Sequence, residues 1–139
     1  MQTAQNKVIR YILNYEHRHH LSVNDFKRVK YLNVERRVEY LSLCVMHRVV
    51  GNRAPSYLCT FQRVSDVHSH FTRNSQLSYV IPHVKTQGRF SFMHNAAKLW
   101  NGLPDTIKAV INGDTFKKKC KMFLFGKMAL AESSDFLYY

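Results

Sequence analysis

The chain has 139 residues, of which 45% are hydrophobic and 13% aromatic, and it carries 21 Lys and Arg against nine Asp and Glu. This composition predicts one domain, or one domain with a tail, that buries a hydrophobic core, and it excludes a globally disordered chain. No apolar run approaches the ~20 residues of a bilayer span, and we expect no secretory signal at the N-terminus.

The net charge of +12 predicts a polyanionic partner. Nucleic acid is the first candidate and an anionic membrane surface is the second, while a soluble basic domain with neither partner is the plain alternative. Three cysteines, Cys44, Cys59 and Cys120, have no C-x-x-C spacing. We therefore expect reduced thiols and an intracellular protein, nuclear or cytoplasmic.

The first predicted helix covers residues 2–15. At 100° per residue its apolar residues fall in one sector. They are Met1, Ala4, Val8, Tyr11, Ile12 and Tyr15. The opposite sector holds Asn6, Lys7, Arg10 and Asn14, with no acid before Glu16. A solvated helix face explains this sector equally well, but amide and cationic groups together also suit phosphate contact, so Lys7 and Arg10 are candidate nucleic-acid-binding residues.

Two further helices follow in the first half. Ser22, with Asp25 three residues later, predicts the start of a short helix whose cationic residues Lys27, Arg28 and Lys30 join the candidate set. Asn33 predicts the cap of the longest helix, residues 34–50, which ends at Gly51 in the C′ position. The expected inward stripe of that helix is Val34, Val38, Leu41, Val45 and Val49, and its second half is apolar all round.

The second half begins with a short helical turn at Pro55. Residues 77–81 are rich in β-formers and end at Pro82, so they predict a short strand that pairs with residues 89–90 in a small hairpin. Ser91 predicts the cap of a helix that runs to Trp100, which we expect in the core. A short helix over residues 105–110 comes next.

Asp114 predicts the cap of the last helix. Phe116, Cys120, Phe123 and Leu124 share one side of it, and Lys117, Lys118 and Lys121, also candidates for nucleic-acid binding, share the other. We expect a frayed tail over residues 129–139. The fold class is thus mainly α, with a helical part over residues 1–60, a second part over residues 61–128 and at most one small hairpin.

Catalytic chemistry has no signature here. Two-metal polymerase chemistry needs clustered carboxylates, and the chain has no Asp-Asp pair, no Gly-x-Ser-x-Gly and no glycine-rich phosphate loop. Cys44 and His47 lie one turn apart, but apolar neighbours favour Cys44 as a buried hydrophobe. The clusters His17–His20 and His68–His70 lack nearby cysteines, so we expect no metal, no cofactor and no enzyme.

Six segments, in order, carry a family resemblance. The first segment, Gln2-Thr3-Ala4-Gln5-Asn6-Lys7-Val8-Ile9-Arg10, is similar to the family motif Leu-Gln-x-x-Gln-Asn-(Arg/Lys)-Ala-x-Arg. The second segment, residues 31–37, is similar to the motif Leu-x-Trp-Leu-Pro-Val-x-x-Arg. In this second segment Tyr31 stands where the motif has tryptophan, and Asn33 stands where it has proline. The other four segments are Ala54-Pro55-Ser56-Tyr57-Leu58, His70-Phe71-Thr72-Arg73, Gly88 to Pro104, and Thr115-Phe116-Lys117-Lys118-Lys119. Together they resemble the thumb and post-thumb region of LINE-type (non-LTR, jockey-like) retrotransposon reverse transcriptases.

The resemblance implies a parent enzyme that copies element RNA into DNA, and a thumb that holds the template–primer duplex. We expect the catalytic palm to be missing from this chain. The predicted function is therefore noncatalytic, sequence-independent contact with the phosphates of RNA, DNA or an RNA–DNA hybrid, with no membrane partner. The alternative is a vestigial or structural fragment whose apolar faces once packed on the missing polymerase core.

Overall fold

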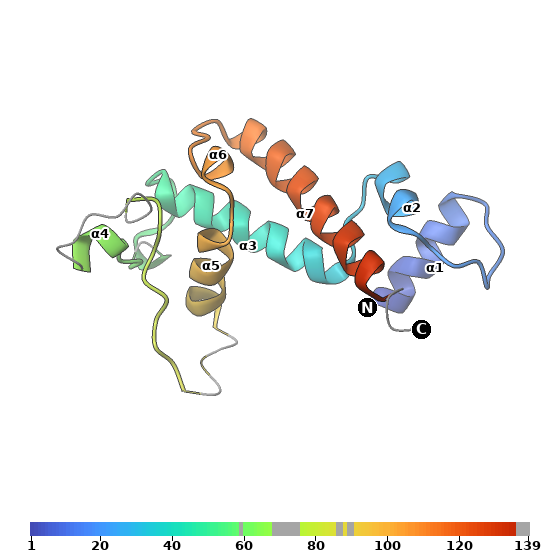
Figure 1. The fold of residues 1–139 in the computed structure, drawn as a ribbon, viewed down its shortest axis with the longest axis horizontal. Coiled ribbons are helices and arrows are strands. Elements are labelled where there is room, and N and C mark those ends of the chain that lie inside the picture. Colours follow the sequence, from blue (N-terminus) through green and yellow to red (C-terminus); the bar gives the residue numbers. More distant parts are fainter. Residues whose placement is uncertain (59, 68–75, 86–87, 89–90, 136–139) are drawn as a thin grey trace. The chain divides into compact units, whose positions relative to one another are not determined.

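The computed structural model describes residues 1–58, 60–67, 76–85, 88 and 91–135. Helices dominate these residues, as predicted, and Figure 1 shows them in chain order. Contacts divide the chain into a terminal unit, residues 1–40 and 119–139, and a middle unit, residues 41–118. The predicted boundary at residue 60 differs from this division, whose boundaries fall inside two long helices, α3 (Val34–Val50) and α7 (Gly113–Asp135).

The terminal unit contains α1 (Gln2–Ile12), α2 (Val23–Arg28), the start of α3 and most of α7. Its core is built from apolar side chains of α1, α2 and α7 and of the connecting loops. Fully or nearly buried are Ile9, Leu21, Val23, Phe26, Leu32, Cys120, Leu124 and Met128. Glu132 of α7 accepts a bond from the backbone N–H of Val23 at 2.8 Å, so α7 is helical and anchored where a frayed tail from residue 129 was expected.

The predicted inward face of α1 is wrong. Ile9 is its buried residue, while Val8, Tyr11 and Ile12 are exposed. The packed side is instead fixed by amides: Gln5 Nε2 donates to Leu32 O at 2.7 Å, and Gln2 Oε1 accepts from Val34 N at 2.9 Å. These bonds satisfy backbone groups next to the start of α3, which apolar side chains cannot do.

The capping prediction for α2 is confirmed. Asp25 Oδ2 accepts from the backbone N–H of Ser22 at 2.9 Å and from the Ser22 hydroxyl at 3.0 Å. The carboxylate thus lies in the first turn, where the helix dipole favours negative charge. Phe26 and Leu32 are buried.

The middle unit contains the rest of α3, a 3₁₀ turn η1 (Ser56–Leu58), and α4 (Val64–Val67), α5 (Phe92–Asn101), α6 (Asp105–Lys108) and the start of α7. Its core includes Leu43, Met46, Val49, Trp100 and Phe116. The predicted stripe of α3 is wrong in part, because Val38 and Leu41 are exposed. The apolar second half of α3 supplies the core from the side that bears Leu43 and Met46.

Three helix ends refine the sequence predictions. Asn33 caps α3, because its Oδ1 accepts from Arg36 N at 2.9 Å. The longest helix was predicted to be α3, but α7 is longer. Asn52, not Gly51, takes the left-handed conformation after α3, with φ 53°. Asn112, not Asp114, caps α7: its Oδ1 accepts from the N–H groups of residues 114 and 115 at 2.9 and 3.0 Å.

The extended segment near residue 79 pairs differently from the expected hairpin. Tyr79 forms an isolated antiparallel bridge with Arg63, and the flanking bonds are Val64 N to Ser78 O and Val80 N to Gln62 O. The expected partner, residues 89–90, lies outside the described residues. The described part of the chain therefore contains a bridge but no sheet.

Candidate nucleic-acid interface

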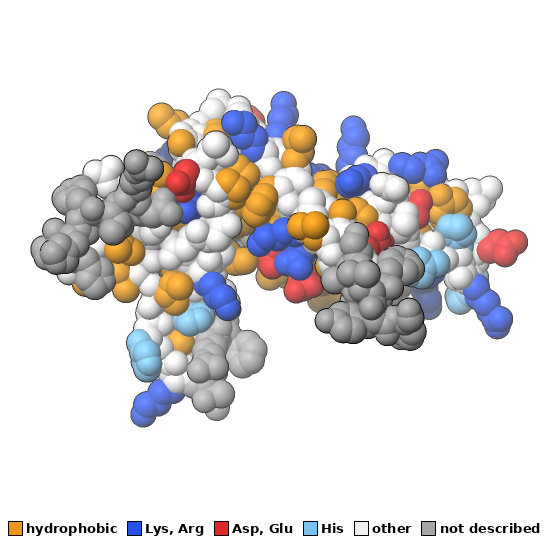
Figure 2. Space-filling model, viewed as in Figure 1, with side chains coloured by type: hydrophobic (Ala, Val, Ile, Leu, Met, Phe, Trp, Pro, Cys, Tyr) orange, Lys and Arg blue, Asp and Glu red, His pale blue; other side chains and the backbone are white. Residues whose placement is uncertain are grey.

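The eight candidate cations are divided between the two units. The terminal unit carries Lys7, Arg10, Lys27, Arg28, Lys30 and Lys121, and the middle unit carries Lys117 and Lys118. Six of the eight are exposed, while Arg10 and Lys121 are half-buried. On the face drawn in Figure 2, Lys and Arg side chains are interspersed with hydrophobic ones and do not gather into a separate patch.

Lys7 and Arg10 do not share one environment, although both lie on α1. Arg10 Nε donates to the backbone oxygen of His19 at 2.8 Å, and the Arg10 side chain lines a cavity of about 320 Å³ inside the terminal unit together with Glu35 and Glu132. Lys7 is exposed and makes no ion pair among the described residues. Lys7 is thus available to a phosphate, whereas Arg10 also fastens the loop after α1.

The cations of α2 lie beside a buried carboxylate. Arg28 Nη1 donates to Tyr15 Oη at 2.9 Å, and Tyr15 donates to Asp25 Oδ1 at 2.9 Å. Burial alone would raise the pKa of Asp25, but the bonds from the Ser22 N–H, the Tyr15 hydroxyl and the Ser22 hydroxyl lower it below 3.8. The same bond to Asp25 raises the pKa of Tyr15 above 10.0. Asp25 therefore stays charged and keeps Arg28 and Tyr15 in place.

Lys30 adopts a backbone conformation that disfavours lysine. Three described residues other than glycine have positive φ, and the other two, Asn14 and Asn52, are asparagines. Asparagine and glycine tolerate this region, whereas a lysine there costs roughly 1–2 kcal/mol. Lys30 is nevertheless exposed at the end of α2, with φ 57°. No contact of its side chain within the described residues explains the choice of lysine.

The faces of α7 follow the prediction in part. Phe116, Cys120 and Leu124 are buried and Lys117 and Lys118 are exposed, as predicted, whereas Phe123 and Lys121 are both half-buried. Lys117 pairs with Asp114 at 3.2 Å, but both side chains are largely in solvent, so the pair contributes little. The candidate set omitted Lys119, which is exposed and continues the run Lys117-Lys118. It also omitted exposed cations that form no run with the candidates, and these are Arg18, Arg37, Arg48, Arg53, Arg63, Lys85 and Lys98.

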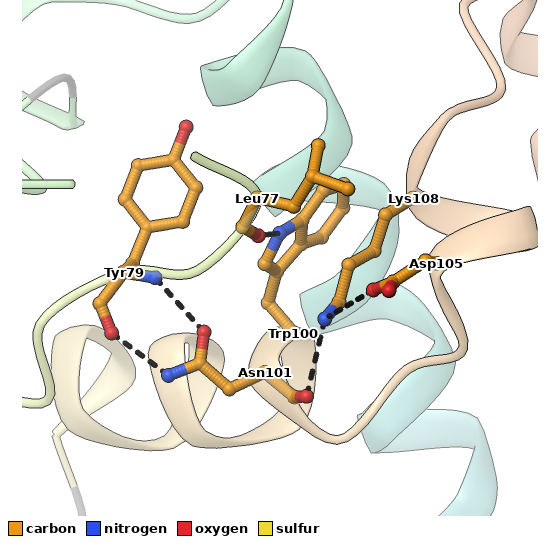
Figure 3. A network of polar contacts seen from close by, with 6 residues as sticks. All are labelled: Leu77, Tyr79, Trp100, Asn101, Asp105 and Lys108. Carbon is orange, nitrogen blue, oxygen red and sulfur yellow. Dashed lines mark hydrogen bonds and ion pairs between the residues drawn. The ribbon is translucent and has the colours of Figure 1, made fainter. Parts of the chain in front are cut away.

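The segment Trp100–Pro104, which contributes strongly to the family resemblance, has a structural role. Trp100 is buried and its Nε1 donates to Leu77 O at 3.0 Å. The Asn101 amide accepts from Tyr79 N at 2.9 Å and donates to Tyr79 O at 2.8 Å (Figure 3). Two adjacent side chains of α5 therefore fasten the extended segment around residue 79. Trp100 is in the core, as predicted.

Lys108 completes this network from α6. Its side chain is 1% exposed, and its Nζ donates to Asn101 O at 3.2 Å and to Asp105 Oδ1 at 3.3 Å (Figure 3). The ammonium thus neutralises the C-terminal end of α5, where the helix dipole favours a cation.

A cavity of about 520 Å³ adjoins the network, and its lining includes both Arg63 and Asp66. Because charges of both signs line it, the cavity shows no preference for an anion.

Potential metal ligands do not cluster in the described part of the chain. The described residues contain no group of three or more His, Cys, Asp or Glu side chains able to hold a metal. His47, considered with Cys44, is buried, stacks on Phe116 and contacts Val110 O through Nε2 at 2.8 Å. Cys44 is half-buried and Cys120 is buried. Cys59 and the His68–His70 cluster lie outside the described residues, as does the Thr72-Arg73 motif.

The described helices include none that is both long enough and apolar enough to cross a membrane. Comparison with protein families, curated proteins and solved structures found no match.

Proposed function

We propose that this chain is a noncatalytic nucleic-acid-binding module that contacts phosphates without regard to base sequence. The observation that carries the proposal is the excess of exposed, unneutralised cations. Only Arg36, Lys108 and Lys117 form ion pairs with carboxylates among the described residues. The remaining charge is available to a polyanion, and Lys7, Lys27 and Lys118 are exposed examples.

The proposed origin is the thumb and post-thumb region of a LINE-type retrotransposon reverse transcriptase. The six ordered motifs support this origin, and the bonds of Trp100 and Asn101 give a physical reason why two motif residues would be retained together. In this proposal the template–primer duplex, or an RNA–DNA hybrid, is the partner, and the reaction itself belongs to a polymerase core.

A salt titration tests the proposal. Fluorescence anisotropy with a labelled RNA–DNA hybrid should show an affinity loss of about 10³-fold between 50 and 200 mM salt if roughly six phosphates are contacted. The double variant Lys7→Ala, Lys27→Ala should lower the salt slope by up to about two and weaken binding to all sequences alike. The control variant Thr3→Ala, Asn24→Ala changes exposed neutral residues of the same helices and should leave the slope unchanged. Affinity that is flat across this salt range would remove the proposal.

The second candidate is a structural fragment whose apolar faces belong against a polymerase core. It is favoured by large hydrophobic side chains in solvent, of which Ile111, Met122 and Leu130 are 73–87% exposed. This candidate predicts oligomers by light scattering and a broad thermal transition by circular dichroism. A monomer with a cooperative transition and salt-dependent nucleic-acid binding would decide for the first candidate.

A further inference from the structure

We infer that the solvent-facing side of α1 is a platform for unpaired nucleotides, on which Tyr11 stacks a base and Lys7 contacts the adjoining phosphate. The inference rests on the proposed function and adds, beside the duplex that the other exposed cations contact, an unpaired strand bound at this helix. It differs from the sequence prediction, which considered phosphate contact only for the polar sector with Lys7 and assigned Tyr11 to the apolar sector.

The arrangement follows from the side by which α1 is attached. Ile9 is fully buried, and the amides of Gln2 and Gln5 bond to backbone groups of the terminal unit. The other side of the same helix is therefore held outward. It presents Tyr11, which is 88% exposed, and the apolar stripe continues round the helix through Val8, 53% exposed, to Ile12, which is 52% exposed and lies one turn after Ile9.

Lys7 borders this stripe. Residues 7 and 11 are one helical turn apart, so the ammonium and the phenol ring lie on the same side of the helix. Lys7 is exposed and forms no ion pair within the described residues. A cation next to an exposed aromatic ring is the pairing that single-strand-binding proteins use, because the ring stacks on a base of any identity and the cation contacts the backbone.

A duplex does not match this surface. Its exterior offers sugars and phosphates, while the apolar faces of its bases are stacked inside, so Val8, Tyr11 and Ile12 would lie against charged groups. An unpaired strand exposes base faces together with phosphates and thus complements both parts of the surface.

Charge argues against two other occupants. A second copy of this chain would bring together two bodies of net charge +12, and residues 1–15 contain Lys7 and Arg10 but no acid to offset them. An acidic partner helix or an anionic membrane would match the charge, but neither would use the stacking capacity of Tyr11. These occupants are outcomes of the test below.

The test compares Tyr11→Ala with Tyr11→Phe on two probes. The probes are a fluorescein-labelled oligothymidylate and the same strand annealed to its complement. Tyr11→Ala should weaken single-strand binding by roughly tenfold, because one stacked base contributes about 1–3 kcal/mol, and should change duplex binding by less than about twofold. Tyr11→Phe keeps the ring and should bind like the unchanged chain. Tyr57→Ala, which removes a tyrosine that is also exposed but lies in the middle unit, should have no effect.

The outcomes are distinguishable. If the unchanged chain binds neither probe, the proposed function fails and this inference fails with it. If it binds both probes and Tyr11→Ala alters them equally or not at all, the inference alone is overturned. The inference would also be overturned if Tyr11→Ala left single-strand affinity unchanged and instead abolished binding to phosphatidylserine vesicles. The same holds if this variant abolished a dimer seen by light scattering while single-strand affinity stayed unchanged. Because Tyr11 is almost fully in solvent, its replacement should leave the circular dichroism spectrum unaltered.

Discussion

The side-chain amide of Asn101 binds both backbone polar groups of Tyr79, accepting from its N–H at 2.9 Å and donating to its carbonyl at 2.8 Å. Asn101 thereby acts as the partner that a neighbouring strand would provide in a sheet. An extended segment with only one β-bridge is thus held against α5 by the last residue of that helix.

Replacement of Asn101 by alanine should lower the free energy of unfolding by about 2 kcal/mol. Two hydrogen bonds are lost, and the N–H of Tyr79, a buried residue, is left without its partner. Urea titration measures the change. The control, Asn24→Ala, alters an exposed asparagine and should cost less than about 0.5 kcal/mol. Equal effects of the two variants would contradict this role of Asn101.

The two members of the Lys108–Asp105 pair should respond differently to substitution. Lys108→Met removes the buried ammonium from the end of α5 and should destabilise the chain by about 1–3 kcal/mol. Asp105→Asn alters a side chain that is 53% exposed, and its cost should stay below about 0.5 kcal/mol. Thermal unfolding of both variants decides the matter. If they lose the same stability, the ion pair rather than the bond to Asn101 O is what matters.

Asp25 should make stability depend on pH in the acid range. Its pKa in the folded state lies below the 3.8 of the unfolded chain, so the unfolded state binds the proton more readily. The contribution is fully present above pH 3.8 and is lost as the pH falls through the lowered folded-state pKa. At neutral pH Asp25→Asn should cost about 1 kcal/mol, and the difference from the unchanged chain should shrink towards pH 2.

The matched control for Asp25 is Glu16→Gln. Glu16 is exposed and no side-chain contact of its carboxylate is found in the described residues. Urea titrations at several pH values should therefore show the same acid dependence in Glu16→Gln as in the unchanged chain. A difference that stays constant with pH in Asp25→Asn would show that the carboxylate charge is not involved.

Lys30→Gly should be more stable and bind nucleic acid less well. Glycine removes the steric cost of φ 57°, and the gain is partly offset by a more flexible unfolded chain, leaving about 0.5 kcal/mol. Loss of one exposed cation should lower the salt slope of binding by about one. Lys30→Asn, which also tolerates this conformation, is the companion variant. Lower stability in both would show that lysine is not strained there.

The predictions that succeeded concern groups that act locally. Ser22 with Asp25, and Asn33 before α3, cap helices through bonds within three residues, which the sequence displays directly. Most of the buried face of α7 was also predicted correctly, because Phe116, Cys120 and Leu124 repeat at helical spacing and are buried, while Phe123 is half-buried.

The predictions that failed depend on groups distant in sequence. The apolar sector of α1 suggested which side of the helix is buried. The helix is instead attached through Gln5, which bonds to Leu32, 27 residues away, so a prediction from hydrophobicity selected the wrong side. Tyr79 was assigned to a hairpin, and neither Arg63 nor Asn101 could be foreseen as its partner. Which cations contact a phosphate depends likewise on tertiary surroundings, as Arg10 shows by binding His19 O.

The single tryptophan provides an intrinsic probe of one half of the molecule. Trp100 is enclosed in the middle unit, stacked near Phe116 and bonded to Leu77 O, so its emission should shift to longer wavelength when that unit opens. The terminal unit contains tyrosines but no indole. Fluorescence excited at the red edge of the indole absorption, where tyrosine does not absorb, therefore follows the middle unit by itself. A far-ultraviolet circular dichroism signal recorded in parallel reports whether both units unfold in one transition or in two.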